Sequence, residues 1–157
     1  MMTASMEVKD ILKEAVTISE GTSFKDAIAL MIEKKTNSLL VTNEAGELIG
    51  EVSVADLLRA VVPEYLSDDS VAAHFATGDM FDESVQDAAE KQVTFFMTTK
   101  THPVKATESV MAVATNAIAY NRVRIPVVDE DNKPVGIVSR RGLKHIIGDA
   151  LGIKDSE

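Results

Sequence analysis

The sequence predicts a mixed α/β fold in which a single β-α-β-β-α unit occurs twice. Shifting the sequence against itself by 86 positions aligns residues 16–61 with residues 102–147 without a gap. The aligned residues keep the same order of apolar runs, helical spacings and polar turns, which indicates a structural repeat. Identical pairs at this offset include Ser23/Ser109, Val41/Val127, Glu44/Glu130, Gly50/Gly136, Val52/Val138, Ser53/Ser139 and Leu57/Leu143.

Three short strands are expected in each copy. The first is brief and extended, the second is a buried strand rich in Leu and Val or Ile and Val, and the third follows a polar turn. These strands cover residues 15–19, 38–42 and 48–52 in the first copy, and residues 103–106, 125–128 and 134–138 in the second.

Two helices complete each copy, because apolar residues recur there at intervals of three and four. One helix lies between the first two strands, and the other follows the third strand. The apolar positions are Phe24, Ala27, Ile28, Met31, Ile32, Leu57, Leu58 and Val61 in the first copy, and Val110, Val113, Ala114, Ala117, Ile118, Leu143, Ile146 and Ile147 in the second.

The two copies are expected to form one compact module, because neither sheet would be well buried alone. We assign residues 1–62 to the first copy, 93–152 to the second and 153–157 to a polar tail. The connection at residues 63–92 is too long for a structureless loop, so we expect one or two short helices there, broken near Gly78. The copies should pack face to face, related by pseudo-twofold symmetry.

Composition argues against several classes of function. The chain has 157 residues, of which 45% are hydrophobic, and it contains no Cys. Thiol catalysis, zinc-thiolate sites and disulfides are therefore excluded. His74, His102 and His145 are widely spaced, and the sequence contains neither a Gly-rich phosphate loop nor a nucleophile elbow. We expect no catalytic residues and no metal site.

The net charge of −9 disfavours binding to nucleic acid or to anionic membranes. No apolar run approaches the roughly 20 residues that span a bilayer, and residues 1–9 lack the features of a signal peptide. We therefore expect a cytoplasmic protein with no membrane span. A local basic cluster fits either a small anionic ligand or a solvated surface, and consists of Arg122, Arg124, Lys133, Arg140, Arg141 and Lys144.

Ser53 and Asp56 lie where the third strand of the first copy passes into a helix. The N-terminus of a helix favours an anion, and the Ser53 hydroxyl could donate to a phosphate oxygen. A carboxylate one turn further on could accept from the two hydroxyls of a ribose. The same spacing is close to a capping box, in which both side chains only satisfy the helix end. Residues 53–56, the Ser-x-x-Asp sequence, favour the cap when they are taken alone. Their place in a paired repeat instead favours a ligand.

The chain resembles a tandem CBS-domain pair, also called a Bateman module. The family pattern combines a strand of the form hPVVD, a Gly before the last strand, and then Ser or Thr, two residues and Asp. The second copy contains Arg124-Ile125-Pro126-Val127-Val128-Asp129 and Gly136-Ile137-Val138-Ser139, and the first contains Gly50-Glu51-Val52-Ser53-Val54-Ala55-Asp56. The resemblance covers about residues 8–151 and leaves the connecting insertion atypical.

The resemblance implies a nucleotide site in a cleft between the copies, to which both contribute. Asp56 would hold the ribose, and Arg124 with Ser53 would hold phosphate. Glu51 could accept from an adenine amino group, or could spoil the pocket as a buried carboxylate. The remaining residues of this site would be Val104, Val123 and Ile137 around the adenine, with His102 as a further hydrogen-bonding side chain.

A second, weaker site would be the mirror image of the first. Its Asp position is occupied by Gly142, so no carboxylate is left there to hold a ribose. We therefore expect one competent site. The second site would comprise Val16, Ile18, Asn37 and Ser38 with Ser139, and Arg140, Arg141 and Lys144 could attract phosphate or form surface or subunit contacts.

The expected function is that of a regulatory module that senses AMP, ADP, ATP or S-adenosylmethionine. We also expect a homodimer and a separate, unidentified effector protein as partners. The alternative is a CBS-pair dimerisation module whose ligand sites are degenerate and empty. Glu51 and Gly142 favour that alternative, whereas the presence of Ser53, Asp56 and Arg124 in one site argues against it.

Overall fold

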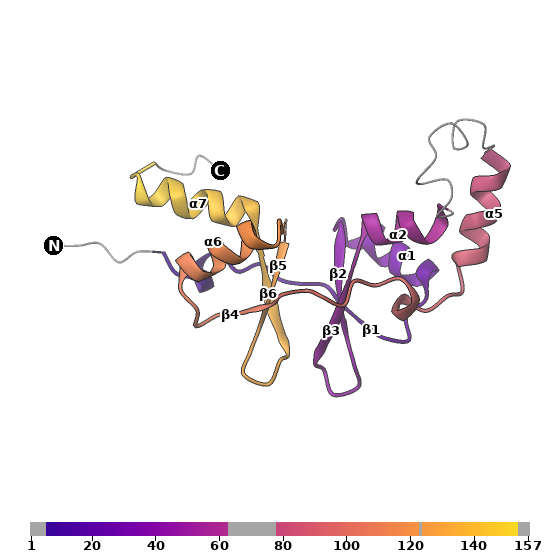
Figure 1. The fold of residues 1–157 in the computed structure, drawn as a ribbon, viewed down its shortest axis with the longest axis horizontal. Coiled ribbons are helices and arrows are strands. Elements are labelled where there is room, and N and C mark those ends of the chain that lie inside the picture. The colour runs from indigo at the N-terminus through magenta and orange to yellow at the C-terminus, as the bar shows by residue number, and fades with distance from the viewer. Residues whose placement is uncertain (1–5, 63–77, 123, 154–157) are drawn as a thin grey trace. The chain divides into compact units, whose positions relative to one another are not determined.

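The computed structural model describes residues 6–62, 78–122 and 124–153. These residues form helices and two separate three-stranded sheets (Figure 1), which confirms the predicted mixed α/β fold. The chain divides into two compact units. The first unit comprises Val16–Ala45 and Ile49–Lys100, and the second comprises the chain up to Ala15, Gly46–Leu48 and the chain from Thr101.

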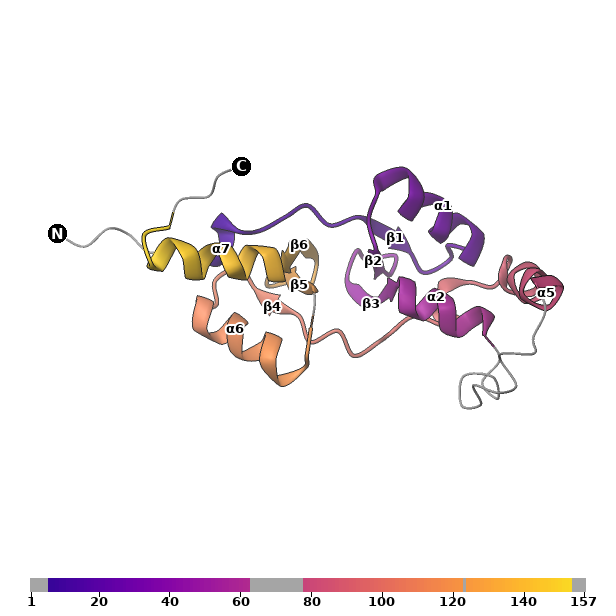
Figure 2. The ribbon, with the colours of Figure 1, turned by 90° about the horizontal axis from the view of Figure 1, so that it is seen from above.

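The first unit contains the first β-α-β-β-α copy. Its sheet has the order β1-β2-β3, and β1 runs parallel to β2 with Ile18 opposite Val41. Both helices of the copy lie on one side of this sheet (Figures 1 and 2). The elements are β1 (Thr17–Ser19), α1 (Phe24–Lys34), β2 (Ser38–Thr42), β3 (Leu48–Ser53) and α2 (Val54–Val61).

The second unit contains the second copy, with the sheet order β4-β5-β6. In this unit β4 is parallel to β5, and β5 is antiparallel to β6 with Arg124 opposite Ser139. Adding 86 to the bounds of β2 and β3 reproduces the bounds of β5 and β6, so the predicted repeat is confirmed strand by strand. The elements are β4 (Val104–Lys105), α6 (Val110–Ala119), β5 (Arg124–Val128), β6 (Pro134–Ser139) and α7 (Arg140–Ala150).

A serine caps the N-terminus of each helix of the two copies. The hydroxyl oxygens of Ser23, Ser53, Ser109 and Ser139 each accept a hydrogen bond from the backbone N–H three residues later. A side-chain acceptor at this position satisfies one of the N–H groups that the helix leaves without a partner. The identical serines of the repeat therefore define where its helices begin.

Most of the predicted apolar helix positions are buried or partly buried, but two in each copy are exposed: Ile32 and Leu58 in the first copy, and Ile118 and Ile147 in the second. Ala27 and Met31 of α1 are buried, as is Val113 of α6. By contrast, Ile32 is 72% exposed and Ile118 is 83% exposed, although both continue the helical spacing. They occupy the same position of the repeat. Helical spacing alone therefore does not establish that an apolar side chain is buried.

Each sheet is extended by a segment that precedes the first strand of the other copy in the sequence. In the first unit, Thr98 and Glu51 exchange backbone hydrogen bonds of 2.9 Å. In the second unit, Lys13 and Ile137 form the same antiparallel bridge, also with two bonds of 2.9 Å. Two short 3-10 helices begin these segments, η1 (Val8–Asp10) and η2 (Val93–Phe95). The compact units therefore differ from the two halves of the sequence.

The connecting region contributes one described helix, α5 (Gly78–Ala88). It packs against α2 at the edge of the first unit (Figure 2). A bridge between Gln92 and Ser23, the N-cap of α1, then joins this region to the first copy. Residues 63–77 of the expected insertion lie outside the described residues. Among the helices that the structure describes, none is long and apolar enough to cross a membrane.

Candidate functional site

The junction of β3 and α2 carries a capping box. The backbone N–H of Asp56 donates to Ser53 Oγ over 3.3 Å, and the backbone N–H of Ser53 donates to Asp56 Oδ2 over 2.8 Å. Both reciprocal bonds of a capping box are present, so this role of the two residues is confirmed. The cap does not exhaust the contacts of the Asp56 carboxylate.

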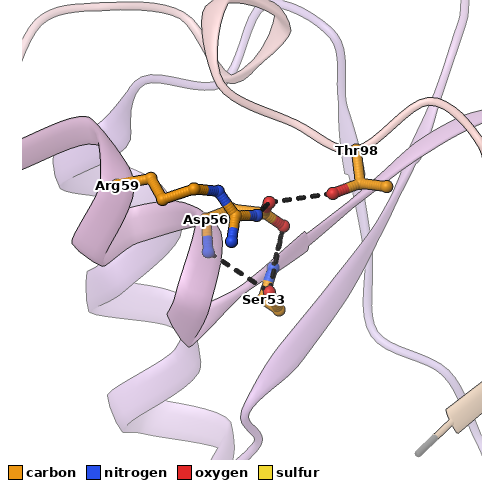
Figure 3. Close-up of polar contacts among 4 residues, drawn as sticks. All are labelled: Ser53, Asp56, Arg59 and Thr98. Atoms are coloured by element: carbon orange, nitrogen blue, oxygen red, sulfur yellow. Dashed lines mark hydrogen bonds and ion pairs between the residues drawn. The ribbon is translucent and has the colours of Figure 1, made fainter. Parts of the chain in front are cut away.

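Asp56 is the centre of a buried polar cluster, although an acidic residue in the first turn of a helix is usually exposed. Only 1% of Asp56 is exposed. Its Oδ2 also accepts from Ser53 Oγ over 3.0 Å. Its Oδ1 accepts from Thr98 Oγ1 over 2.8 Å and from Nη2 of Arg59, with which it also forms an ion pair (Figure 3). We call Ser53, Asp56, Arg59 and Thr98 the Asp56 cluster.

A second Ser-x-x-Asp sequence in the same unit shows what a simple cap looks like. Ser23 caps α1, and its Oγ accepts from the Asp26 N–H over 3.1 Å. Asp26 is exposed, whereas Asp56 is buried and bonded to a residue 42 positions away. The two sites share their sequence spacing but differ in burial and in long-range partners. Capping alone therefore does not account for the surroundings of Asp56.

Thr98 and Arg59 are members of this cluster that the sequence reading did not identify. Arg59 follows Asp56 by three residues on one helix, a spacing at which side chains meet, so the sequence contained a signal for it. Thr98 precedes the first strand of the second copy and belongs to no recognisable motif. It reaches Asp56 because its segment pairs with β3 at Glu51, which only the tertiary structure shows.

Glu51 is buried in β3, at 9% exposure. Its backbone pairs with Thr98. Glu51 is thus adjacent to the Asp56 cluster through its backbone pair with Thr98. Whether it helps to hold a ligand stays a prediction.

The other residues predicted for this site belong to the second unit. Val104 is buried in the apolar core of that unit, and Arg124 and Ile137 are half-buried in β5 and β6. The His102 ring stacks on Tyr120, with ring centroids 3.5 Å apart and planes 6° apart, which the sequence reading did not anticipate. The His102 carbonyl accepts from Asn116 Nδ2 over 3.0 Å. Val123 lies outside the described residues.

The residues predicted for the second, weaker site also fall in both units. In the first unit, Ile18 and Ser38 are buried, and Val16 packs against the apolar core. In the second unit, Ser139 caps α7 by accepting from the Gly142 N–H over 3.2 Å. The exposed Arg140 donates from Nη2 to Asn121 Oδ1 over 3.3 Å.

Gly142 has a packing role that its sequence position did not reveal. A Cβ added at Gly142 would lie 3.1 Å from Ile11 Cβ and 3.4 Å from the Ile11 carbonyl oxygen. Ile11 directly precedes the segment that pairs with β6. The absence of a carboxylate at this position thus coincides with close packing of the N-terminal segment on α7.

Two lysines at the surface have pKa values raised by neighbouring carboxylates. A hydrogen bond from Lys105 Nζ to Glu130 raises the pKa of Lys105, and the Glu7 carboxylate raises the pKa of Lys9 in the same way. In the part of the chain that the structure describes, no three His, Asp or Glu side chains are grouped as metal ligands.

These features belong to a known class of protein. The family model of the CBS domain matches the chain twice, over residues 8–63 and 91–149. Together these segments cover well over half of the sequence, and each contains one β-α-β-β-α copy. The chain therefore belongs to the CBS domain family and is a tandem CBS pair.

Solved CBS-pair structures have the same fold. CBSX2 from Arabidopsis thaliana superposes with a TM-score of 0.70 at 25% identity, covering 95% of this chain and 96% of that one. CBSX2 in complex with AMP gives a TM-score of 0.66 at 26% identity, with 95% and 98% coverage. The CBS domain pair of protein MJ0100, in complex with 5′-methylthioadenosine and S-adenosyl-L-methionine, gives 0.66 at 26% identity, with 91% and 100% coverage.

Sequence relatives include both short and long proteins. The uncharacterized protein MJ1426 of Methanocaldococcus jannaschii is 28% identical over 151 residues, which cover 88% of this chain and 89% of that protein. A homoserine O-acetyltransferase of Methanococcoides burtonii is 28% identical over 142 residues, or 90% of this chain. The match covers only 24% of that enzyme.

Proposed function

We propose that this CBS pair is a regulatory module that binds an adenosyl ligand and itself catalyses no reaction. The candidate ligands are AMP, ADP, ATP and S-adenosylmethionine. The observation that carries the proposal is the Asp56 carboxylate at the N-terminus of α2. It is buried and bonded to a distant residue, and a helix cap requires neither. Similar CBS pairs of known structure hold AMP, or 5′-methylthioadenosine and S-adenosyl-L-methionine, which supports the class of ligand.

The proposed contacts follow the chemistry of the side chains. Asp56 is an acceptor without donors and suits the two hydroxyls of a ribose. Ser53 at the helix end, with Arg124 of the second copy, suits a phosphate or another anionic tail. The adenine would contact Val104, Val123 and Ile137, and Glu51 or His102 would supply a hydrogen bond. Val16, Ile18, Ser38, Ser139 and Arg140 form the weaker second site in this proposal.

Calorimetric titration of the four candidate ligands tests the proposal. We expect micromolar binding of at least one ligand, weakened about 10- to 100-fold in Asp56→Ala, because hydrogen bonds to a charged group are lost. Asp26→Ala is the matched control, since Asp26 has the same spacing from its capping serine but is exposed. Equal effects of the two substitutions, or no binding by any ligand, would reject the adenosyl site.

A second candidate function is a dimerisation or interaction module with empty sites. Gly142, which supplies no carboxylate, and the exposed Ile32 and Ile118 favour this candidate. In either case we propose that the protein acts in the cytoplasm as a homodimer that signals to a separate effector. The acidic helix α5, with exposed Met80 and Phe81, is a candidate contact for that effector.

A further inference from the structure

The Asp56 carboxylate has no unused acceptor position in this structure. A carboxylate offers about four lone-pair positions on its two oxygens. Here Oδ2 accepts from the N–H and the hydroxyl of Ser53, and Oδ1 accepts from Thr98 and Arg59 (Figure 3). A ligand hydroxyl can therefore bond to Asp56 only if one of these donors leaves.

The two donors at Oδ1, Arg59 and Thr98, are the ones that a ligand can displace. The Ser53 bonds are part of the cap that begins α2, and breaking them would leave N–H groups at the helix end without partners. The Arg59 side chain is 66% exposed, so water can replace the carboxylate as its partner. Thr98 is half-buried but lies in a segment held to β3 by the bridge at Glu51, not within an element of its own.

We propose that Arg59 and Thr98 close the ribose subsite in the ligand-free protein and are displaced by the ligand. This inference rests on the proposed adenosyl function and names the residues that regulate that site. A vicinal diol takes both acceptor positions of Oδ1 and releases both donors. Thr98 and Arg59 thus oppose binding, although they surround the carboxylate that the ligand needs.

The release of Thr98 has a consequence beyond the site. Its segment is held to the first unit by the side-chain bond to Asp56 and by the backbone pair with Glu51. This segment leads directly into β4, the first strand of the second copy, which begins at Val104. Occupation of Asp56 by a ligand weakens the hold on this segment, and thereby couples binding to the chain that joins the two copies.

Two variants test the displacement. Thr98→Val keeps the shape of the side chain but removes the hydroxyl, so we expect AMP to bind about tenfold more tightly, because a competing hydrogen bond to a charged group is gone. Thr99→Val is the matched control, since Thr99 is the exposed neighbour of Thr98. AMP that lacks the 2′- and 3′-hydroxyls should show no gain with Thr98→Val, because it does not compete for Asp56.

Arg59→Ala is tested with adenosine, which has the diol but no charge, so that removal of a cation does not change the attraction of the ligand. We expect tighter binding of adenosine than by the wild type, and no change in Lys34→Ala, which removes an exposed cation from α1. Thermal unfolding of each variant confirms that it is folded.

Hydrogen exchange distinguishes the displacement from a purely structural role for Thr98, because a structural role predicts no change in exchange when the ligand binds. Adding AMP to the wild type should increase exchange of the Thr98 amide, which donates to the Glu51 carbonyl, while α2 keeps its protection.

Each result distinguishes between the two proposals. Unchanged or weaker binding in Thr98→Val and Arg59→Ala would overturn the displacement and leave the adenosyl function standing. Increased protection of Thr98 with ligand would do the same. If neither the wild type nor any variant binds AMP or adenosine, the adenosyl function fails, and the displacement fails with it.

Discussion

Asp56 and Gly142 occupy the same position of the repeat. Each contacts the segment that extends the sheet of its unit, which we call the crossing segment: the segment of Thr98 in the first unit and the segment of Ile11 and Lys13 in the second. The two contacts differ in kind. Asp56 accepts a hydrogen bond from Thr98, whereas Gly142 leaves room for Ile11. One contact is polar and can be exchanged for a ligand hydroxyl. The other is a close apolar approach that no polar ligand can replace. This difference is consistent with one responsive site and one structural anchor in the module.

The role of Gly142 can be measured with two alanine substitutions in α7. Alanine at a helical glycine normally stabilises by about 0.5–1 kcal/mol, and we expect this for Gly148→Ala, where the nearest atoms lie 4.0 Å from the new Cβ. Gly142→Ala should instead be less stable than Gly148→Ala by about 1–3 kcal/mol, because its Cβ meets Ile11. Urea unfolding of both variants checks this difference, and equal stabilities would contradict the packing role.

At the scale of the elements, a glycine at the same position of β3 and β6 allows each crossing segment to lie close to its sheet. A Cβ at Gly136 would lie 2.6 Å from the Lys13 carbonyl oxygen and 2.8 Å from the Leu12 side chain. A Cβ at Gly50 would lie 2.5 Å from Met97 Sδ and 3.1 Å from the Thr98 carbonyl oxygen. The family glycine is therefore explained by a neighbouring chain in each unit and not by a turn.

These contacts predict unequal effects of alanine at the two glycines. Gly136→Ala should destabilise the protein by about 1–3 kcal/mol, because the obstructing atom is backbone and has to shift. Gly50→Ala should have a smaller effect, since the flexible Met97 side chain can move aside. Thermal unfolding compares them, with Gly21→Ala as a control because no atom lies within 4 Å of its added Cβ. A larger loss for Gly50→Ala would contradict this account.

At the scale of the whole molecule, two apolar side chains at one repeat position remain exposed. Ile32 on α1 and Ile118 on α6 are exposed to solvent and are not buried against their own sheets. Removing exposed apolar side chains from water favours association. The proposed homodimer would bury them against a second copy.

The dimer prediction is tested by light scattering after size-exclusion chromatography. We expect the wild type to have the mass of a dimer and Ile32→Lys/Ile118→Lys to have that of a monomer, because burying two unpaired charges opposes association. Phe95→Lys serves as a control, since it changes an equally exposed apolar residue outside α1 and α6. A monomeric wild type, or a dimeric double variant, would exclude these helices as the interface.

Much of this architecture could be predicted from local patterns. The 86-residue offset placed β2, β3, β5 and β6 to within a residue, because strand length, apolar content and turn residues are short-range properties. Ser53 and Asp56 were found for the same reason, since a helix cap depends on residues three apart. The exposure of Ile32 and Ile118 was not predicted, because helical periodicity indicates a face but not the width that a sheet covers.

The sequence by itself determined the repeat, the order of strands and helices, the serine caps and membership of the CBS family. Only the tertiary structure decided which segment lies beside which sheet, and through this the environment of Asp56. Thr98 reaches Asp56 across 42 residues, and Ile11 reaches Gly142 across a still longer stretch of chain. Such contacts depend on the path of the backbone through space, whereas helical spacing and strand patterns depend on neighbours in the sequence.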